Sequence, residues 1–375
     1  MIKATKPVMP AYEAYIEEIK SIWDQGQMTN NGPKVQKLRQ MVLDYTNGTE
    51  AELYVNGHMA LLLGIKAMNL PKGGEVLTSP FTFVSTTNAI VQSGLVPVFC
   101  DVDEHYNIDI DSIRRNISSK TCAIITPHIF GIPCHVDEIE QIAKEYGLKV
   151  LYDGAQAFGT KIREKHIGLY GDATMFSFHA IKVYNSIEGG CLMYADPQLK
   201  QQLEILRNFG ITYGETNDVI VDGYNGKMDE FRAAMGILNL PELEHEIEKR
   251  TEIAAWYQEA LKEIPGITSY AFADPDVRYN YAYFPVTIDA DTFGMTRDAL
   301  WKHLREDYGI ETRKLYDTLT CDNTFYKNKG YQTDVAYARK LTERCMDFPM
   351  YGTIEKSDVL EIAEAIKRLY HSEEK

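Results

Sequence analysis

The sequence is poor in the features that mark secreted and membrane-spanning proteins. Its 375 residues include six cysteines, and no two of them are spaced as CxxC, which argues against a disulfide-rich secreted scaffold. No segment approaches the roughly 18 consecutive apolar residues of a membrane helix, and the first ten residues, MIKATKPVMP, lack the apolar region of a signal peptide. We therefore expect reduced, mostly buried cysteines, a cytoplasmic location and no membrane partner.

Basic residues and common cofactor signatures are scarce as well. The chain has 39 lysines and arginines against 54 acidic residues, a formal net charge of -15, and no basic cluster of the length that marks a nucleic-acid-binding surface. It has no HExxH motif, no GxGxxG after a strand and no GxxxxGK[ST] motif. A metal site, a nicotinamide-dependent dehydrogenase and a P-loop enzyme are therefore not predicted. A small anionic ligand is compatible with the charge, because a helix N-terminus can hold a phosphate locally.

What the sequence does contain is the composition and patterning of an α/β protein. Hydrophobic residues make up 45% and charged residues 25%, close to the average for globular chains. From about residue 55 to 194, short apolar runs alternate with amphipathic segments, which is typical of βα units around a buried, mostly parallel sheet. The seven expected strands are at residues 52–55, 75–78, 96–100, 122–126, 149–152, 174–177 and 191–194. Helices are expected to start after Asn56-Gly57, near Thr82 and after Val136.

The C-terminal third is expected to form a smaller α+β domain. Helical spacing begins at about Asp229, and a charged amphipathic helix at 244–264 stops at Pro265-Gly266. We predict a large domain over residues 1–243, N-terminal arm included, and a small domain over 244–375 that includes this connecting helix. The small domain is expected to contain a strand at 281–288 and helices at 297–308 and 357–370.

Two stretches place polar groups at the carboxyl ends of strands, where a parallel sheet binds its ligands. In VNGHMALLLGI, residues 55–65, a strand breaks at Asn56-Gly57 into an apolar helix, whose first N–H groups could hold a phosphate. A turn glycine kept for backbone reasons is the alternative. In LYDGAQAFG, residues 151–159, Asp153 follows a buried strand directly, and it either meets a ligand or caps the next helix.

A third stretch, FSFHAIKVYNSIEGG at residues 176–190, ends an apolar strand in Lys182. Buried lysines are rare. Partial desolvation lowers the pKa of a lysine amine and makes it a competent nucleophile toward an aldehyde. The alternative is a surface lysine whose aliphatic stem covers the edge of the sheet.

Together these stretches fit the requirements of pyridoxal phosphate. The cofactor needs a lysine for an imine, an acid for its pyridine nitrogen, a helix N-terminus for its phosphate and an aromatic face for its ring. The sequence offers a candidate for each role: Lys182 for the imine, Asp153 for the nitrogen, Phe83 in SPFTFVSTTNAI for the ring, and Gly57, His58 and Ser177 for the phosphate.

Six motifs resemble, in the same order, those of the DegT/DnrJ/EryC1/StrS family of sugar aminotransferases. They are TNNGP (29–33), PFTFVSTTNAI (80–90), GLVPVFCDVD (94–103), YDGAQAFG (152–159), FSFHAIK (176–182) followed by EGG, and GYNGKM (223–228). The resemblance extends from near Lys6 to FPMY at 348–351. It implies a fold-type I pyridoxal phosphate fold, with pyridoxamine phosphate formed during turnover, and a homodimer with shared active sites.

The resemblance also implies roles for individual residues. Lys182 matches the Schiff-base lysine, Asp153 the acid at the pyridine nitrogen, and Gln156 the residue beside the cofactor's phenolic oxygen. The other implied cofactor contacts are Phe83 on the ring and, around the phosphate, Gly57, His58, Met59, Ser177 and, from the neighbouring subunit, Asn225. Relatives that have lost the lysine act as dehydratases, so Lys182 argues against that reaction.

Three residues depart from the pattern that the family usually shows. His58 stands where a threonine or serine is usual, so a hydroxyl ligand for the phosphate is missing. Gly154 replaces an alanine after the acid. Ile181 replaces a threonine before Lys182, which makes the surroundings of the lysine drier.

Within the family, FSFHAIKVYNSIEGG and TPHIFGIPC (126–134) are most similar to transaminases that aminate C4 of a dTDP-4-keto-6-deoxyhexose. The expected amino donor is glutamate, and the expected setting is deoxyamino-sugar biosynthesis for lipopolysaccharide, O-antigen or antibiotics. One alternative is a C3 keto-sugar or aminocyclitol transaminase, and another is a non-catalytic pyridoxal phosphate sensor. The expected contacts of the nucleotide-linked sugar are His179, Lys227, Arg313 and Tyr316, for which pocket shaping, surface charge and packing are the simpler explanations.

Overall fold

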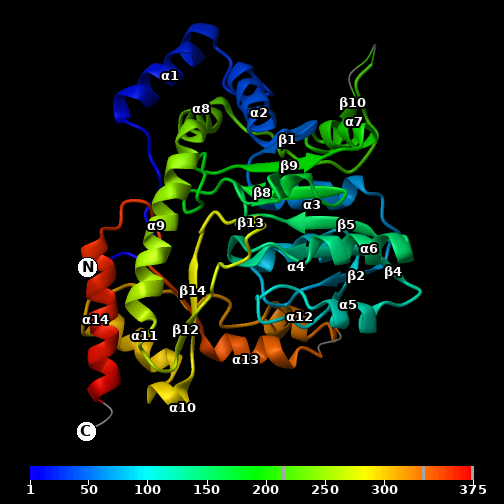
Figure 1. The fold of residues 1–375 in the computed structure, drawn as a ribbon. Helices are drawn as coiled ribbons and strands as arrows, with labels where there is room; N and C mark the ends of the chain where they lie inside the picture. The colour runs from blue at the N-terminus through cyan, green and yellow to red at the C-terminus, as the bar shows by residue number, and fades with distance from the viewer. Residues whose placement is uncertain (213, 215, 332–333, 373–375) are drawn as a thin grey trace.

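The computed structural model describes residues 1–212, 214, 216–331 and 334–372, and its centre is a seven-stranded sheet with helices on both faces (Figure 1). The strands lie in the order β1-β9-β8-β5-β4-β2-β3. Their bounds are β1 Glu50–Tyr54, β2 Glu75–Thr78, β3 Val96–Phe99, β4 Thr121–Pro127, β5 Lys149–Asp153, β8 Ala173–Ser177 and β9 Gly190–Tyr194. The neighbouring strands β3, β2, β4, β5 and β8 pair in parallel, whereas β9 is antiparallel to both β8 and β1. The predicted mostly parallel sheet is confirmed, and each predicted strand is found within two residues of its expected ends.

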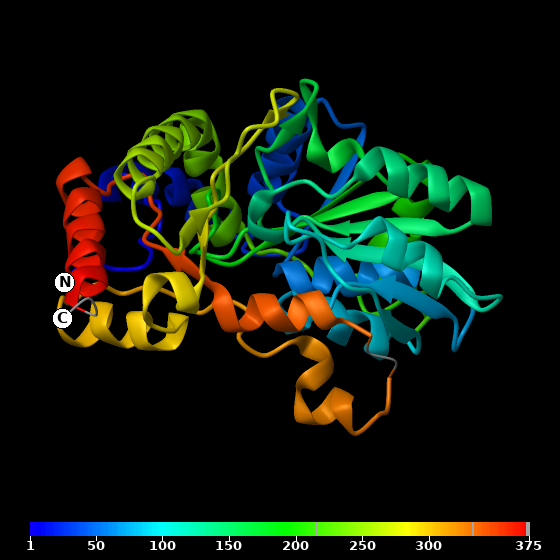
Figure 2. The same ribbon diagram turned by 60° about the horizontal axis from the view of Figure 1, so that its bottom comes forward.

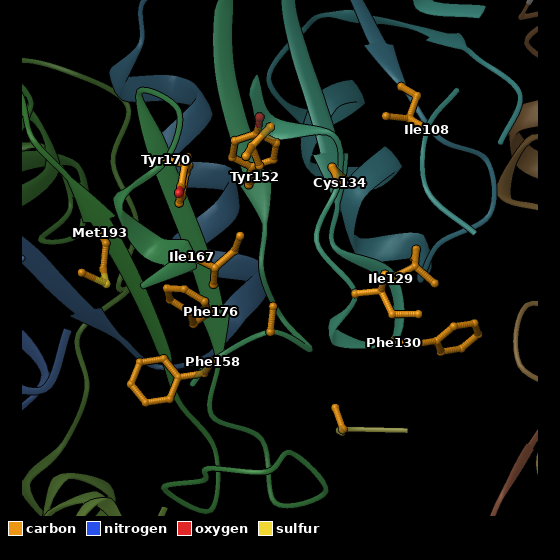
Figure 3. Close-up of a cluster of buried hydrophobic side chains, with 14 of the residues drawn as sticks. Ile108, Ile129, Phe130, Cys134, Tyr152, Phe158, Ile167, Tyr170, Phe176 and Met193 are labelled. Carbon is orange, nitrogen blue, oxygen red and sulfur yellow. The ribbon is translucent and has the colours of Figure 1, made fainter. Parts of the chain in front are cut away.

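Each face of the sheet has its own apolar core, because successive side chains of a strand point to opposite faces. Helices α3 (Gly57–Ala67), α4 (Val84–Gln92) and α7 (Pro197–Leu206) contribute to one core. The other core contains side chains of α2 (Pro33–Thr46), α5 (Ile110–Asn116), α6 (Val136–Tyr146) and α8 (Glu230–Asn239). Figure 3 shows part of this second core, in which Tyr152, Phe176 and Met193 come from the adjacent strands β5, β8 and β9. Strands covered on both faces are mostly apolar, which is why the sequence located them.

Two N-terminal helices are absent from the sequence-based prediction. One is α2, and the other is α1 (Tyr12–Gln25), of whose side chains Ile22 is buried. Helix α1 packs against α8, where the rings of Trp23 and Phe231 meet edge to face at 5.6 Å. Before α1, the chain reaches the far end of the molecule, where Ile2 pairs with Ile310 (Figure 2).

A second layer follows the long helix α9 (Leu243–Leu261), which leads away from the large sheet (Figure 1). Here β12 (Ile267–Ser269), β14 (Phe284–Ile288) and β15 (Cys345–Phe348) form an antiparallel sheet. The predicted connecting helix ends three residues earlier than expected, because the chain turns before Gly266, whose φ is +75°. The two predicted C-terminal helices are found as α11 (Arg297–Glu306) and α14 (Lys356–Ser372).

Short elements connect these layers. They are β6 (Lys161–Ile162), β7 (Lys165–His166), β10 (Ile211–Thr212), β11 (Asp218–Val219), β13 (Val277–Arg278), α10 (Ala290–Phe293), α12 (Thr324–Lys327) and α13 (Ala336–Arg344). The second layer has its own core around Tyr257 and Phe284, yet Tyr283, Leu319 and Leu341 belong to the core of the large sheet. The division of the chain at residue 243 therefore stays a prediction.

The cysteines, the helices and the candidate metal ligands show three general features of the described part of the chain. All six cysteines are free thiols, five of them buried. Among the described helices, none combines the length and the apolar character needed to cross a membrane. Within the same residues, no group of three or more histidine, cysteine, aspartate or glutamate side chains is placed to hold a metal ion.

A buried ion pair at the edge of the large sheet offers a test of the fold. Glu52 on β1 is 2% exposed, and its carboxylate lies 2.6 Å from Arg207 and 3.8 Å from Arg39. Burial raises the pKa of Glu52, and the two arginines oppose that effect. The variant Arg207→Met leaves this carboxylate buried with one distant partner, so we expect the free energy of unfolding in urea to fall by about 3 kcal/mol.

The matched control removes both charges. The double variant Glu52→Leu/Arg207→Met should recover most of the lost stability, because an apolar pair needs no compensating charge. If Arg207→Met alone unfolds at the urea concentration of the native chain, the ion pair does not support the fold.

Candidate active site

A cavity of 540 Å³ opens at the carboxyl ends of β4, β5 and β8, beside the N-termini of α3 and α4. This is the edge at which an open α/β sheet binds its ligands. The structure brings ten of the predicted site residues to its wall: Gly57, His58, Phe83, Asp153, Gln156, Ser177, His179, Lys182, Arg313 and Tyr316.

Asp153 is the last residue of β5, and its carboxyl group is held at both oxygens. Oδ2 accepts a hydrogen bond of 2.7 Å from the hydroxyl of Thr86, and Oδ1 accepts one of 3.0 Å from the N–H of Ala155. The side chain is 5% exposed. Burial raises its pKa, while the two hydrogen bonds and the electrostatic effects of Lys182 and His58 lower it. The acid is therefore a buried group with hydrogen bonds suited to its ionised form.

Lys182 follows β8 in a compact turn. Its N–H donates to the carbonyl of His179 at 2.9 Å, and the N–H of Ser186 returns to the carbonyl of Phe178 at 2.9 Å. Two residues after the lysine, Tyr184 is fully buried, and its hydroxyl donates to the carbonyl of Gly236. The lysine itself is half-buried, and its Nζ lies 6.0 Å from the centre of the Tyr283 ring. The buried neighbours thus fix the backbone from which the amine enters the cavity.

The N-terminus of α3 is packed tightly against the end of β8. A Cβ atom at Gly57 would lie 2.9 Å from Cβ and 3.1 Å from Cα of Ser177, so the close approach requires glycine. Asn56 caps the helix, because its side chain accepts from the N–H of Met59 at 2.9 Å. Met59 does not line the cavity. The first N–H groups of an α-helix have no intrahelical acceptor, so this helix end suits a phosphate.

The imidazole of His58 interacts with α4. Its Nδ1 lies 2.8 Å from the hydroxyl of Ser85, and its Nε2 lies 3.2 Å from Oε1 of Gln92. Both ring nitrogens therefore have partners within the chain. Phe83 precedes α4 and is 67% exposed, which leaves an aromatic face open at the cavity wall.

Gln156 and Tyr316 join two distant parts of the chain at the cavity. The amide oxygen of Gln156 accepts from the N–H of Phe130 at 2.5 Å, and its amide nitrogen donates to the hydroxyl of Tyr316. Burial raises the pKa of Tyr316 well above its usual range. The phenol is therefore neutral and acts as a hydrogen-bonding group at neutral pH.

Arg313 is held in place by a buried acid. Its Nε and one Nη atom lie 3.0 Å and 2.6 Å from Oδ2 of Asp347, which is fully buried. Its guanidinium also lies 4.9 Å from the centre of the Tyr283 ring. Burial opposes the charge of Arg313, but Asp347 outweighs it and raises the pKa of the arginine. Arg313 is thus a fixed cation with N–H groups left over for a ligand.

Some residues of the wall were missed in the sequence. Glu188 lines the cavity, and its carboxylate lies 3.5 Å from Nε2 of His179; the available signal was the EGG motif after FSFHAIK. Thr82 and Ser85 line the cavity as well, and the motif PFTFVSTTNAI was the available signal, because it follows a strand end. Tyr283 gave no signal, since it reaches the cavity from the second layer of the molecule.

Asn225 and Lys227, like Met59, are predicted site residues that do not line this cavity. Asn225 is exposed, and its backbone pairs with that of Asn208. Lys227 donates to Oδ1 of Asn208 at 2.8 Å and borders a separate hollow together with Arg207. Burial, and then Arg207, lower the pKa of Lys227. Neither residue reaches Lys182 of its own chain.

Comparisons with known proteins agree with one family. The family model described as DegT/DnrJ/EryC1/StrS aminotransferase matches residues 11–367. The chain is 35% identical to a dTDP-4-amino-4,6-dideoxy-D-glucose transaminase of Shigella dysenteriae over 96% of both proteins. It is 33% identical to the Escherichia coli transaminase of the same name over 97% of this chain and 98% of that one. The structure of DesI with its TDP-sugar product superposes with a TM-score of 0.91 at 28% identity, over 100% of this chain and 94% of that one.

The glycine at the start of α3 offers a test of the site. In the variant Gly57→Ala, the new methyl group pushes the helix N-terminus away from Ser177. We expect the affinity for inorganic phosphate and for pyridoxal phosphate, measured by calorimetry, to fall about tenfold, the equivalent of one lost hydrogen bond.

The control is Gly64→Ala on the same helix, where a Cβ would meet only side-chain methyl groups of Leu192 and Leu151 at 3.0 to 3.2 Å. This variant should change the unfolding temperature and leave phosphate binding as it was. An equal loss of binding in both variants would mean that the helix N-terminus is not the phosphate site.

Proposed function

Because the chain belongs to the DegT/DnrJ/EryC1/StrS aminotransferase family, we propose that it moves an amino group from L-glutamate to C4 of a nucleotide-linked 4-keto-6-deoxyhexose. The family membership and the enzyme class predicted from the sequence, a sugar aminotransferase, are confirmed. The donor, the carbon that is aminated and a dTDP nucleotide belong to the proposal. So does the cytoplasm as the compartment, which the free thiols support.

The observation that carries the proposal is the meeting of three groups in one cavity. Lys182 comes from the segment after β8, whereas Asp153 and Gln156 come from the end of β5 and the turn that follows it, and all three line the cavity. Aminotransferases of this family depend on pyridoxal phosphate. A lysine, an acid and a neutral amide around one space are the donor set that this cofactor needs.

The residues present fit the cofactor in further respects. The helix end at Gly57 and the hydroxyl of Ser177 are suited to its phosphate, and the exposed ring of Phe83 to its pyridine ring. Asp153 has a hydrogen bond at each oxygen and still lines the cavity, so it can accept a further N–H. When bound, pyridoxal phosphate withdraws electrons from the Cα of an amino acid and allows its amino group to be exchanged for a carbonyl oxygen.

The chain's own groups then have distinct tasks. The amine of Lys182 holds and moves a proton at the donor's Cα, because it is the basic group nearest to the reacting centre. Asp153 keeps a proton on the pyridine nitrogen by remaining ionised. Arg313, fixed by Asp347, binds an anionic part of a substrate, and its preorganised guanidinium lowers the cost of ordering that contact.

The substrate class is supported by the relatives. Two curated transaminases with more than 30% identity are named for a dTDP-4-amino-4,6-dideoxy-D-glucose product, and the similar structure of DesI holds a TDP-sugar product. The apolar side chain of Ile181, exposed beside Lys182, favours a sugar with a methyl group at C6. Together these points favour C4 amination of a 6-deoxy sugar.

The deciding experiment identifies the product. The purified protein, loaded with pyridoxal phosphate, is incubated with L-glutamate and dTDP-4-keto-6-deoxy-D-glucose, and the amination site is read by NMR. We expect an amino group at C4. Amination at C3 of a 3-keto substrate instead would support the C3 transaminase, and bound cofactor without any exchange with glutamate would support a sensor protein.

The same assay tests the lysine. The variant Lys182→Ala should lower the rate by at least about 10³-fold, because it removes the group that moves the proton. The control Lys149→Ala removes a lysine at the opposite end of β5, where it pairs with Asp172, and should retain the native rate. Native activity in Lys182→Ala would overturn the assignment.

We further propose that the protein works as a homodimer in which Asn225 and Lys227 serve the cavity of the partner. Both residues lie outside the cavity of their own chain. Exposed apolar side chains near them, Phe209 and Val219 to Val221, support a covered surface in this region.

Subunit complementation tests this arrangement. The variants Lys182→Ala and Asn225→Ala are each expected to be poorly active. After subunit exchange, half of the molecules are mixed dimers with one intact site, so about a quarter of the native activity should return. If Asn225 served its own chain, no mixed dimer would contain an intact site and no activity would return.

A further inference from the structure

Thr86 on α4 connects Asp153 to the wall of the cavity through two hydroxyl groups. Its Oγ1 donates to Oδ2 of Asp153 at 2.7 Å and lies 3.1 Å from Oγ1 of Thr82. Thr86 is fully buried and Thr82 is 4% exposed. Thr82 and Asp153 line the cavity, whereas Thr86 does not. Among the described side chains, Thr86 is the one that donates a hydrogen bond to this carboxylate.

The direction of the hydroxyl chain follows from the protons available. Each hydroxyl carries one proton. With Asp153 ionised, Thr86 donates to the carboxylate and accepts from Thr82, so both protons are used. With Asp153 protonated at Oδ2, Thr86 must accept from the acid and donate to Thr82, so the carboxyl group loses the hydrogen bond that its charged form receives. The chain therefore favours the ionised form of Asp153.

Other groups around the acid do not replace this contact. Burial raises the pKa of Asp153, and the groups that lower it are Thr86, the N–H of Ala155, Lys182 and His58, in that order of effect. The titratable groups that face it are Lys182, from the segment after β8, His58, from α3, and the buried Tyr316 and Cys134, whose pKa values burial raises. Thr86 is the largest of these opposing influences, and it comes from a fourth element, α4.

We propose that Thr86 positions Asp153 and keeps its carboxylate ionised for the pyridine nitrogen of the cofactor. Thr86 is a positioning residue, because it acts through Asp153 and lines no part of the cavity. The inference rests on the proposed pyridoxal phosphate chemistry, but the property that it concerns belongs to a carboxyl group of the chain itself.

The test replaces Thr86 with valine, which has nearly the same shape and no hydroxyl group. In the cofactor-free protein with ¹³C-labelled aspartate carboxyls, NMR titration should show the pKa of Asp153 raised by about one unit or more, the equivalent of a hydrogen bond to a charged group. In the loaded enzyme, the rate of amino exchange with glutamate should fall about tenfold at neutral pH. The acid limb of its pH profile should move upward, with the KM for glutamate unchanged.

The matched control is Thr87→Val. Thr87 is the next residue of α4 and is equally buried, and its hydroxyl bonds to that of Thr320 at 3.0 Å. This variant should lose similar stability and leave the titration of Asp153 unchanged. Thr86→Ser keeps a hydroxyl and should restore both the titration and the pH profile.

The outcomes separate this inference from the proposed function. If Thr86→Val and Thr87→Val give the same Asp153 titration as the native chain, the inference is wrong, whatever the native protein does with keto sugars. If the native protein transfers no amino group but Thr86→Val raises the pKa of Asp153, the inference about Thr86 holds and the proposed function fails.

Discussion

The burial of the Asp153 carboxyl group is the constraint on which the site depends. An ionised carboxylate removed from water is costly unless hydrogen bonds and opposite charges compensate it. Asp153 lies at the end of β5, between β4 and β8 in the sheet, so its partners come from the segments that meet at this edge. They are a hydroxyl of α4, the N–H of Ala155, and the basic side chains Lys182 and His58. Ala155, Lys182 and His58 also line the cavity, whereas Thr86 does not.

Helix α4 carries much of this arrangement, because four consecutive side chains contact four different partners. Ser85 meets His58 of α3, and Thr86 meets Asp153. Thr87 bonds to Thr320, and Asn88 to Tyr326, in the C-terminal part of the chain. Successive residues of a helix point about 100° apart, so one short helix can join the phosphate turn, the buried acid and the segment that follows Arg313 and Tyr316.

The sequence predicted those parts of the fold whose signal is local. Buried strands are continuous apolar runs, and Lys182, Asp153 and Gly57 each sit next to such a run, so their position at one edge followed from the parallel sheet. Helix α1 was not predicted. Its apolar residues Ile19, Ile22 and Trp23 recur at helical spacing, but they are few and are separated by charged and polar residues. Strands β12 and β15 are three and four residues long, too short for a clear alternation.

The missing parts of the site depend on pairings between distant segments. Tyr316 reaches Gln156 across 160 positions, and Arg313 is fixed by Asp347 across 34. No spacing rule along the chain encodes such contacts. Tyr283 enters the cavity in the same way, from the second layer. For these residues the resemblance to a family indicated a region, and the structure identified the partner that fixes each side chain.

The departure at His58 illustrates why a substitution in a motif has to be judged from its contacts. In the sequence, His58 stands where the family usually has the hydroxyl group of a threonine or serine. In the structure, its ring joins the second residue of α3 to Ser85 and Gln92, at the two ends of α4. A threonine at this position has a single short hydroxyl branch, which could not reach both Ser85 and Gln92. At this position the chain therefore has a bridge between two helices, and in the proposed cofactor site the phosphate would be bound by the backbone N–H groups of α3 and the hydroxyl of Ser177. Because α4 also holds Asp153 through Thr86, the same bridge connects the N-terminus of α3 to the buried acid.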